Sequence, residues 1–175
     1  MRAFAAALIF AACGGSPAPP GAAPPSLSPT DPACTLETPL VPGVPGSPGH
    51  LVPTEVNPNG QSELALVMRT MQEDLKAARA ALLAGRPVAS MVSRHRKLRC
   101  AWPTAASDRN PTFDAFAVGY LASVAALEKA SDAAAFDAVL NTCKACHEQS
   151  CPGPVAAIEA LRLPGGGGDD PQAGP

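Results

Sequence analysis

Proline and glycine are concentrated at the two ends of the chain, and this distribution limits regular structure to the middle. The 175 residues include 21 prolines and 15 glycines, most of them before residue 58 or after residue 163. Proline has no backbone N–H and a fixed φ, so helix cannot form where it is dense. We therefore expect a semi-extended tether over 13–57, one small folded domain over 58–152, and a flexible tail over 153–175.

The middle of the chain has four stretches in which apolar residues recur every three or four positions, which is typical of amphipathic helices. Gly85 would end the first stretch, and Asn110-Pro111 would begin the third. The four apolar faces are Leu64, Val67, Met68, Met71, Leu75, Ala78 and Leu82; then Val88, Met91, Val92, His95 and Leu98, after Pro87 in the first turn; then Phe113, Phe116, Ala117, Tyr120, Leu121, Val124 and Leu127; then Phe136, Val139, Leu140, Cys143, Cys146 and His147. No alternating run indicates a strand. The pattern predicts an all-α fold, an antiparallel four-helix bundle.

Composition gives no indication of a nucleic-acid partner, but it does indicate that the domain needs a large apolar ligand. The net charge is −2 and only 4% of residues are aromatic. With no basic tract and no aromatic platform, nothing indicates nucleic-acid binding. Alanine-rich helix faces bury little apolar area, so such a small domain is expected to be marginally stable without a large apolar ligand.

The N-terminus indicates export. Residues 1–12 have the charge pattern of a signal peptide, with an apolar run too short to span a bilayer. Small residues before Cys13, and Gly14 after it, resemble the bacterial lipobox, in which the cysteine becomes a lipid anchor. An ordinary secretory signal is the alternative. Both place the mature chain outside the cytoplasm, where disulfides form; we expect a periplasmic, membrane-anchored protein.

The motif with the clearest chemistry is Cys143-Lys144-Ala145-Cys146-His147, the C-x-x-C-H pattern of covalent haem attachment. Two thiols one helical turn apart can reach both vinyl groups of a porphyrin, and the histidine can ligate its iron. The alternatives are a zinc site, a thioredoxin-like redox pair and a structural disulfide. A zinc site would need a second pair of ligands, which the sequence does not offer at the right spacing. A redox pair would follow a strand, so haem c is favoured.

A C-x-x-C-H motif on the last of four helices resembles that of class II c-type cytochromes. The resemblance implies His147 as proximal ligand and, where a sixth ligand exists, a methionine early in the first helix. In an up-down bundle that position lies level with His147, and Met68 fits it best. Met71 would lie about 4.5 Å further along the axis. His95 is a weaker candidate for the iron or for a propionate.

Three further cysteines remain. Cys100 and Cys151 close the second and fourth helices, whose ends coincide in an up-down bundle. We expect a Cys100–Cys151 disulfide there, worth roughly 3–4 kcal/mol. Cys34, in the tether, is left over and could compete for either partner.

The predicted function is one-electron transfer by an exported cytochrome with one haem c and a redox partner in the cell envelope. No nucleophile–base pair or paired carboxylates suggest an enzyme. One alternative is a five-coordinate haem protein that binds NO or CO. Another is a haem-free, disulfide-stapled envelope lipoprotein. The sequence leaves open whether two chains form a homodimer.

Overall fold

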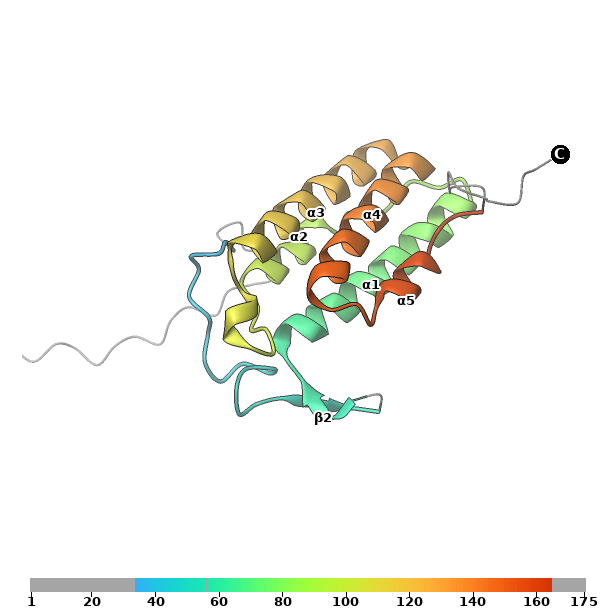
Figure 1. Ribbon diagram of the computed structural model, residues 1–175. Coiled ribbons are helices and arrows are strands. Elements are labelled where there is room, and N and C mark those ends of the chain that lie inside the picture. Colours follow the sequence, from blue (N-terminus) through green and yellow to red (C-terminus); the bar gives the residue numbers. More distant parts are fainter. Residues whose placement is uncertain (1–33, 56, 165–175) are drawn as a thin grey trace, which may run out of the picture.

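The computed structural model describes residues 34–55 and 57–164, and within them the chain is mostly helical (Figure 1). Three long helices form the body: α1 (Glu63–Leu83), α3 (Pro111–Ala130) and α4 (Ala133–Ser150). The shorter elements are the strands β1 (Val52–Thr54) and β2 (Asn57–Gln61), the helices α2 (Val92–His95) and α5 (Val155–Glu159), and the 3₁₀ turns η1 (Arg96–Arg99) and η2 (Ala106–Asp108). The predicted signal peptide and Cys13 lie outside the described residues.

The long helices begin and end where local chemistry favours it. Side chains cap all three at their N-termini: Ser62 accepts from the N–H of Ala65, Asn110 from Phe113, and Asp132 from Ala135. These bonds satisfy backbone donors that have no partner inside a helix. Gly85, with φ of +63°, follows the end of α1 as predicted. No helix in the described part of the chain is both long and apolar enough to cross a bilayer.

The core lies between α1, α3 and α4, and residues from the shorter segments complete it. Phe136, Val124 and Leu127 are fully enclosed at its centre. The remaining buried members are Met71, Leu75, Ala78, Val88, Met91, Leu98, Ala117, Tyr120, Val139, Leu140 and Leu161. The helices α3 and α4 pack side by side (Figure 1).

The second predicted helix is much shorter than expected, so the structure has no fourth long helix among the described residues. The helix begins at Val92 instead of Pro87 and passes into the 3₁₀ turn η1 after four residues. The carboxylate of Glu128 on α3 accepts hydrogen bonds from the N–H groups of Met91 and Val92, both at 2.6 Å. These bonds cap the N-terminus of α2 and favour its start at Val92, and residues 86–91 form no helix.

The expectation of no strand was wrong, and the proline-rich segment is not extended throughout. β1 and β2 form an antiparallel hairpin that pairs Val52 with Gln61. Pro53 and Pro58 are tolerated because a two-stranded sheet leaves outward positions that need no N–H donor. After α4, α5 forms within 153–164, where a flexible tail was expected. α5 packs on α4, and the hairpin contacts α1 through the hydrogen bond that the Arg69 guanidinium donates to the side-chain oxygen of Gln61.

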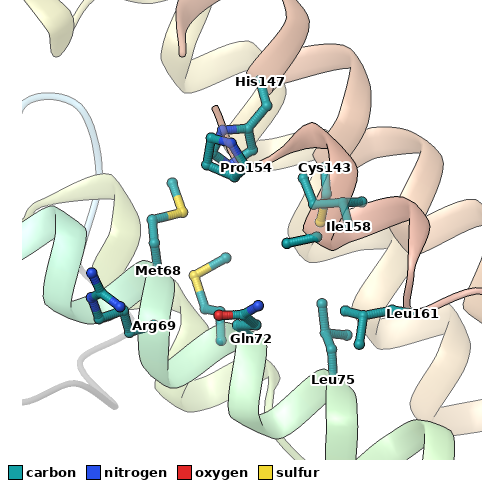
Figure 2. A pocket seen from close by; sticks show the side chains of 11 residues that line it. Met68, Arg69, Gln72, Leu75, Cys143, His147, Pro154, Ile158 and Leu161 are labelled. Carbon is teal, nitrogen blue, oxygen red and sulfur yellow. The ribbon is translucent and has the colours of Figure 1, made fainter. Parts of the chain in front are cut away.

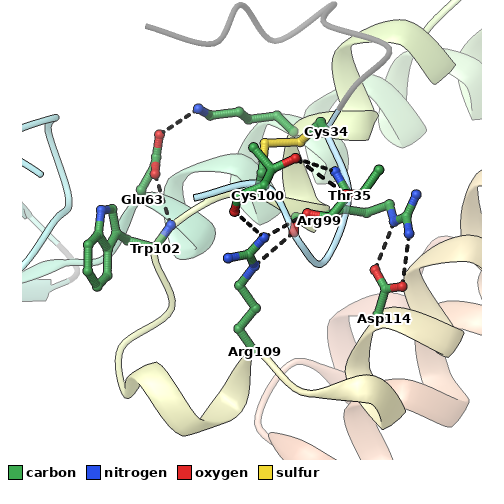
Figure 3. The surroundings of a disulfide bond; sticks show 10 residues. Cys34, Thr35, Glu63, Arg99, Cys100, Trp102, Arg109 and Asp114 are labelled. Carbon is green, nitrogen blue, oxygen red and sulfur yellow. Dashed lines mark hydrogen bonds and ion pairs between the residues drawn. A yellow bond between two sulfur atoms is a disulfide. The ribbon is translucent and has the colours of Figure 1, made fainter. Parts of the chain in front are cut away.

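The expected Cys100–Cys151 disulfide is also wrong: Cys100 is bonded to Cys34, with their Cα atoms 5.4 Å apart (Figure 3). Arg109 holds the returning segment by donating to the carbonyl oxygens of Thr35 (2.7 Å) and Thr38 (2.6 Å). Both bonded cysteines are 2% exposed, whereas Cys151 is an exposed free thiol at the end of α4. The segment around Cys34 therefore folds back and covers Cys100. This differs from the semi-extended tether that was expected over 13–57.

Candidate functional site

The C-x-x-C-H residues occupy the last two turns of α4. Cys143 and His147 are four residues apart and Cys146 lies between them, so all three project from neighbouring positions on one side of the helix. Each is half-buried. The helix continues to Ser150 and ends before Pro152, which cannot extend it. The local sequence thus places two thiols and an imidazole together at the edge of the core.

His147 has one ring nitrogen occupied and the other available. Its Nδ1 lies 3.1 Å from the carbonyl oxygen of Cys151. A carbonyl oxygen can only accept, so the proton must be on Nδ1, and Nε2 keeps a free lone pair. A hydrogen bond of this kind fixes the orientation and tautomer of a metal-ligating histidine and makes it a stronger ligand.

Met68 on α1 faces this side chain across a hollow. Figure 2 shows the Met68 thioether on one wall and the His147 ring on the other, with Cys143 beside them. Three hollows lie beside the two residues, and Met68 and His147 line all of them. Met71 lines two of the three but is 5% exposed and belongs to the core. The structure therefore brings Met68 and His147 together, as the sequence predicted.

The lining of the hollows suits a largely apolar group with one polar edge. One, of about 170 Å³, lies toward α5 and is lined mainly by aliphatic side chains. A second, small one lies toward Phe113, Phe116 and Tyr120 on α3. The third, of about 340 Å³, is bordered by the polar residues Ser62, Thr104 and Ser150. A group bound between Met68 and His147 would border all three, with its polar edge toward the third.

The two thiols are poor candidates for redox exchange. Burial, and to a smaller extent the neighbouring Cys146, raises the pKa of Cys143 to about 12. Burial also raises the pKa of Cys146. Thiol–disulfide exchange requires a thiolate, and burial opposes its formation here. Among the described residues there is also no cluster of three histidine, cysteine or acidic side chains that could hold a metal ion alone.

His95, a weaker candidate ligand, has neither ring nitrogen available. It is 1% exposed, with Nε2 at 2.9 Å from a carboxylate oxygen of Asp74 and Nδ1 at 2.8 Å from the hydroxyl of Tyr120. An imidazole ligates iron through an unprotonated nitrogen, and both nitrogens here are used within the protein. The structure assigns His95 to a buried hydrogen-bond network instead.

Some residues that line the site were missed by sequence reasoning. Pro154, Ile158 and Leu161, in and beside α5, close the hollow next to Cys143 (Figure 2). Ion pairs hold this segment on α4: Glu159 pairs with Lys144 at 3.0 Å, and Arg162 pairs with Asp137 at 3.4 Å. The three-residue spacing of Val155, Ile158 and Leu161 was a usable signal, hidden among prolines and glycines.

Comparison of the chain with protein-family models, with curated proteins and with solved structures gives no match. The site must therefore be interpreted from its own geometry.

Proposed function

We propose that this chain is an exported c-type cytochrome that binds one haem c and transfers single electrons in the cell envelope. The observation that carries the proposal is the free Nε2 of His147, held beside two thiols on the same helix and opposite Met68. No other arrangement of the described residues combines two attachment points, a nitrogen ligand and a sulfur ligand around one apolar space. In this proposal Cys143 and Cys146 form the two thioether bonds.

The chain's own residues would determine how the site behaves. Haem supplies an iron that accepts and releases one electron. His147 would ligate it from α4, with its ring fixed by the carbonyl of Cys151. Met68 would ligate from α1, and a thioether ligand favours a raised reduction potential. The aliphatic wall at α5 would exclude water from one side, and the polar hollow by Ser62 and Thr104 would face the redox partner.

In this proposal, the resemblance to class II c-type cytochromes concerns the order and direction of the helices. α1, α3 and α4 would correspond to three helices of the antiparallel four-helix bundle, and the α2–η1 segment would take the place of the second. Export through the signal peptide, a lipid anchor at Cys13 and a periplasmic location belong to the same proposal, because c-type haem is attached outside the cytoplasm.

Haem attachment can be tested by expression in a host competent for cytochrome c assembly. The purified protein is denatured and extracted with acidic acetone, and the absorption spectrum is recorded before and after. We expect the colour to remain with the wild-type polypeptide and to be lost from the double variant Cys143→Ala/Cys146→Ala. Cys151→Ala is the matched control and should keep its haem.

The spectrum also separates the alternatives. A low-spin spectrum with a methionine–iron charge-transfer band supports the electron carrier. A high-spin spectrum that responds to CO would instead indicate a five-coordinate protein that binds NO or CO. A colourless wild-type protein would contradict both and favour a haem-free envelope lipoprotein.

A further inference from the structure

Three side chains from three different helices form a continuous hydrogen-bonded line through the interior. Asp74 on α1 contacts Nε2 of His95 on α2 at 2.9 Å, and Nδ1 of His95 contacts the hydroxyl of Tyr120 on α3 at 2.8 Å. His95 is 1% exposed and Tyr120 is 4% exposed. Nothing in the proposed electron transfer uses these groups, although buried titratable side chains are uncommon in so small a core.

The two ends of this line open on two different hollows. Asp74 lines a surface hollow of about 250 Å³ together with Arg86 and Arg94. Tyr120 lines the hollow beside Cys143, the first attachment cysteine. Burial, followed by the nearby Cys143 thiol and Asp74, raises the pKa of Tyr120 well above its ordinary value. The line thus connects a solvent-facing hollow with the candidate cofactor site.

The protons on the line follow from its hydrogen bonds. Burial opposes ionisation of Asp74, but hydrogen bonds from Arg94 and then His95 outweigh it and lower the pKa of its carboxyl. The carboxylate accepts, so Nε2 of His95 carries a proton. Burial lowers the pKa of His95 and so favours the neutral imidazole, in which Nδ1 accepts from the Tyr120 hydroxyl. Nδ1 is then the one site at which a further proton can bind.

We propose that the Asp74–His95–Tyr120 line takes up a proton, so that each electron gained at the cofactor site is accompanied by uptake of one proton at His95. This proposal rests on the proposed cytochrome function. The electron comes from the redox partner, and the proton comes from solvent at the hollow beside Tyr120. The Tyr120 hydroxyl passes its proton to Nδ1 and takes one from this hollow, so that Nδ1 becomes an N–H donor to the hydroxyl oxygen while Asp74 keeps its hydrogen bond with Nε2.

The coupling has an electrostatic cause. Reduction lowers the positive charge beside Tyr120, and in a low-dielectric interior this change favours a positive charge on His95. Burial lowers the pKa of His95, while its contact with Asp74 raises it; Arg94 on α2 also lowers it, and Glu128 on α3 also raises it. The reduced protein should bind this proton more tightly than the oxidised protein, and by linkage protonation should favour reduction.

The pH dependence has a definite sign. Burial lowers the pKa of His95 from its ordinary value of 6.5, so we expect the dependence to begin in the acidic range. The window lies between the pKa of His95 in the oxidised protein and its higher pKa in the reduced protein. Within this window, at a fixed electrode potential, the ratio of reduced to oxidised protein should fall by up to tenfold for each unit by which the pH rises. Outside that window the ratio should be constant.

The test is a potentiometric titration of the haem-loaded protein from about pH 4.5 to about pH 8.5, the range in which histidines titrate. His95→Gln is the diagnostic variant, because an amide can donate to Asp74 and accept from Tyr120 but cannot bind the proton. We expect the wild type to show the pH-dependent window and His95→Gln to lose it. His50→Gln, at an exposed position, is the matched control and should behave as the wild type.

The outcomes distinguish this inference from the function on which it rests. A haem-loaded wild type whose potential does not change with pH overturns the proton coupling and leaves the cytochrome intact. The same holds if His95→Gln keeps the wild-type window, or if Tyr120→Phe, which cuts the line at the cofactor end, leaves the window unchanged. Failure of the wild type to retain haem at all overturns the proposed function, and this inference with it.

Discussion

Met68 of α1 and His147 of α4 line the same three hollows, although 79 positions separate them in the sequence. The N-terminal half of α1 and the C-terminal half of α4 therefore meet at one end of the domain, as in an up-down arrangement of helices. This pairing is the basis for assigning the two residues as ligands from opposite sides of one group.

Substitution of Met68 tests that assignment. In the haem-loaded protein, Met68→Ala should convert low-spin ferric iron to high-spin, because it removes the sulfur ligand. Met71→Ala is the matched control: it should remain low-spin while losing about 2–5 kcal/mol of stability through a core cavity. Absorption spectra of both variants decide the question. An unchanged spectrum for Met68→Ala would exclude Met68 as a ligand.

Loss of the Cys34–Cys100 disulfide should destabilise the domain markedly. The bond joins positions 66 residues apart, and loop-closure entropy assigns such a loop roughly 4 kcal/mol of stabilisation. We expect Cys34→Ser to lower the free energy of unfolding by an amount of that order in denaturant titrations. Cys151→Ser should have little effect. The reverse ranking, or a cross-linked peptide containing Cys151 in mass spectrometry, would contradict the observed pairing.

Gly46 should be far less tolerant of a side chain than Gly49. Both have positive φ, +90° and +80°, so alanine is strained at either position. A Cβ on Gly46 would lie 2.1 Å from the backbone nitrogen of Glu63 at the start of α1, whereas one on Gly49 would meet nothing within 4 Å. Thermal unfolding should show Gly46→Ala to be the more destabilised by at least about 1–2 kcal/mol. Equal losses would mean that residues 46 and 63 do not approach closely.

The attachment of α5 should depend on pH. Hydrogen bonds from Arg162 and then Lys144 lower the pKa of Glu159 to about 2. In the unfolded chain that pKa is near 4.5, so the carboxylate contributes stability above pH 4.5 and loses it as the pH falls toward 2. The side chain is 35% exposed, so solvent screening limits the contribution to under about 1 kcal/mol.

Glu159→Gln should therefore be slightly less stable than the wild type at pH 7, and this difference should disappear near pH 2. Glu148→Gln, which removes a looser contact of 3.8 Å to Lys144, serves as the control. Free energies of unfolding across the acid range provide the measurement. A difference that persists at pH 2 would show that the ion pairs are not its source.

Local signals predicted the long helices well. The three- and four-residue spacing of apolar side chains, Asn110 before Pro111, and Gly85 after α1 are each determined within a few residues of sequence. The C-x-x-C-H motif was equally local, and the meeting of Met68 with His147 required only that α1 and α4 run antiparallel.

Long-range contacts account for the errors. The start of α2 at Val92 is favoured by Glu128, more than 35 residues away, which accepts from the N–H groups of Met91 and Val92. The cysteine pairing depends on Arg109 holding the carbonyls of Thr35 and Thr38. Proline density indicated that residues 34–57 could not form helix, but it did not indicate that they would pack against the domain.

Intact-mass spectrometry of the protein from a haem-attachment host, followed by peptide mapping, is the direct test of covalent haem attachment. We expect a polypeptide heavier by the mass of one haem, with the whole increment on the peptide that contains Cys143, Cys146 and His147. An unmodified mass, with both cysteines free or joined to each other, would contradict it.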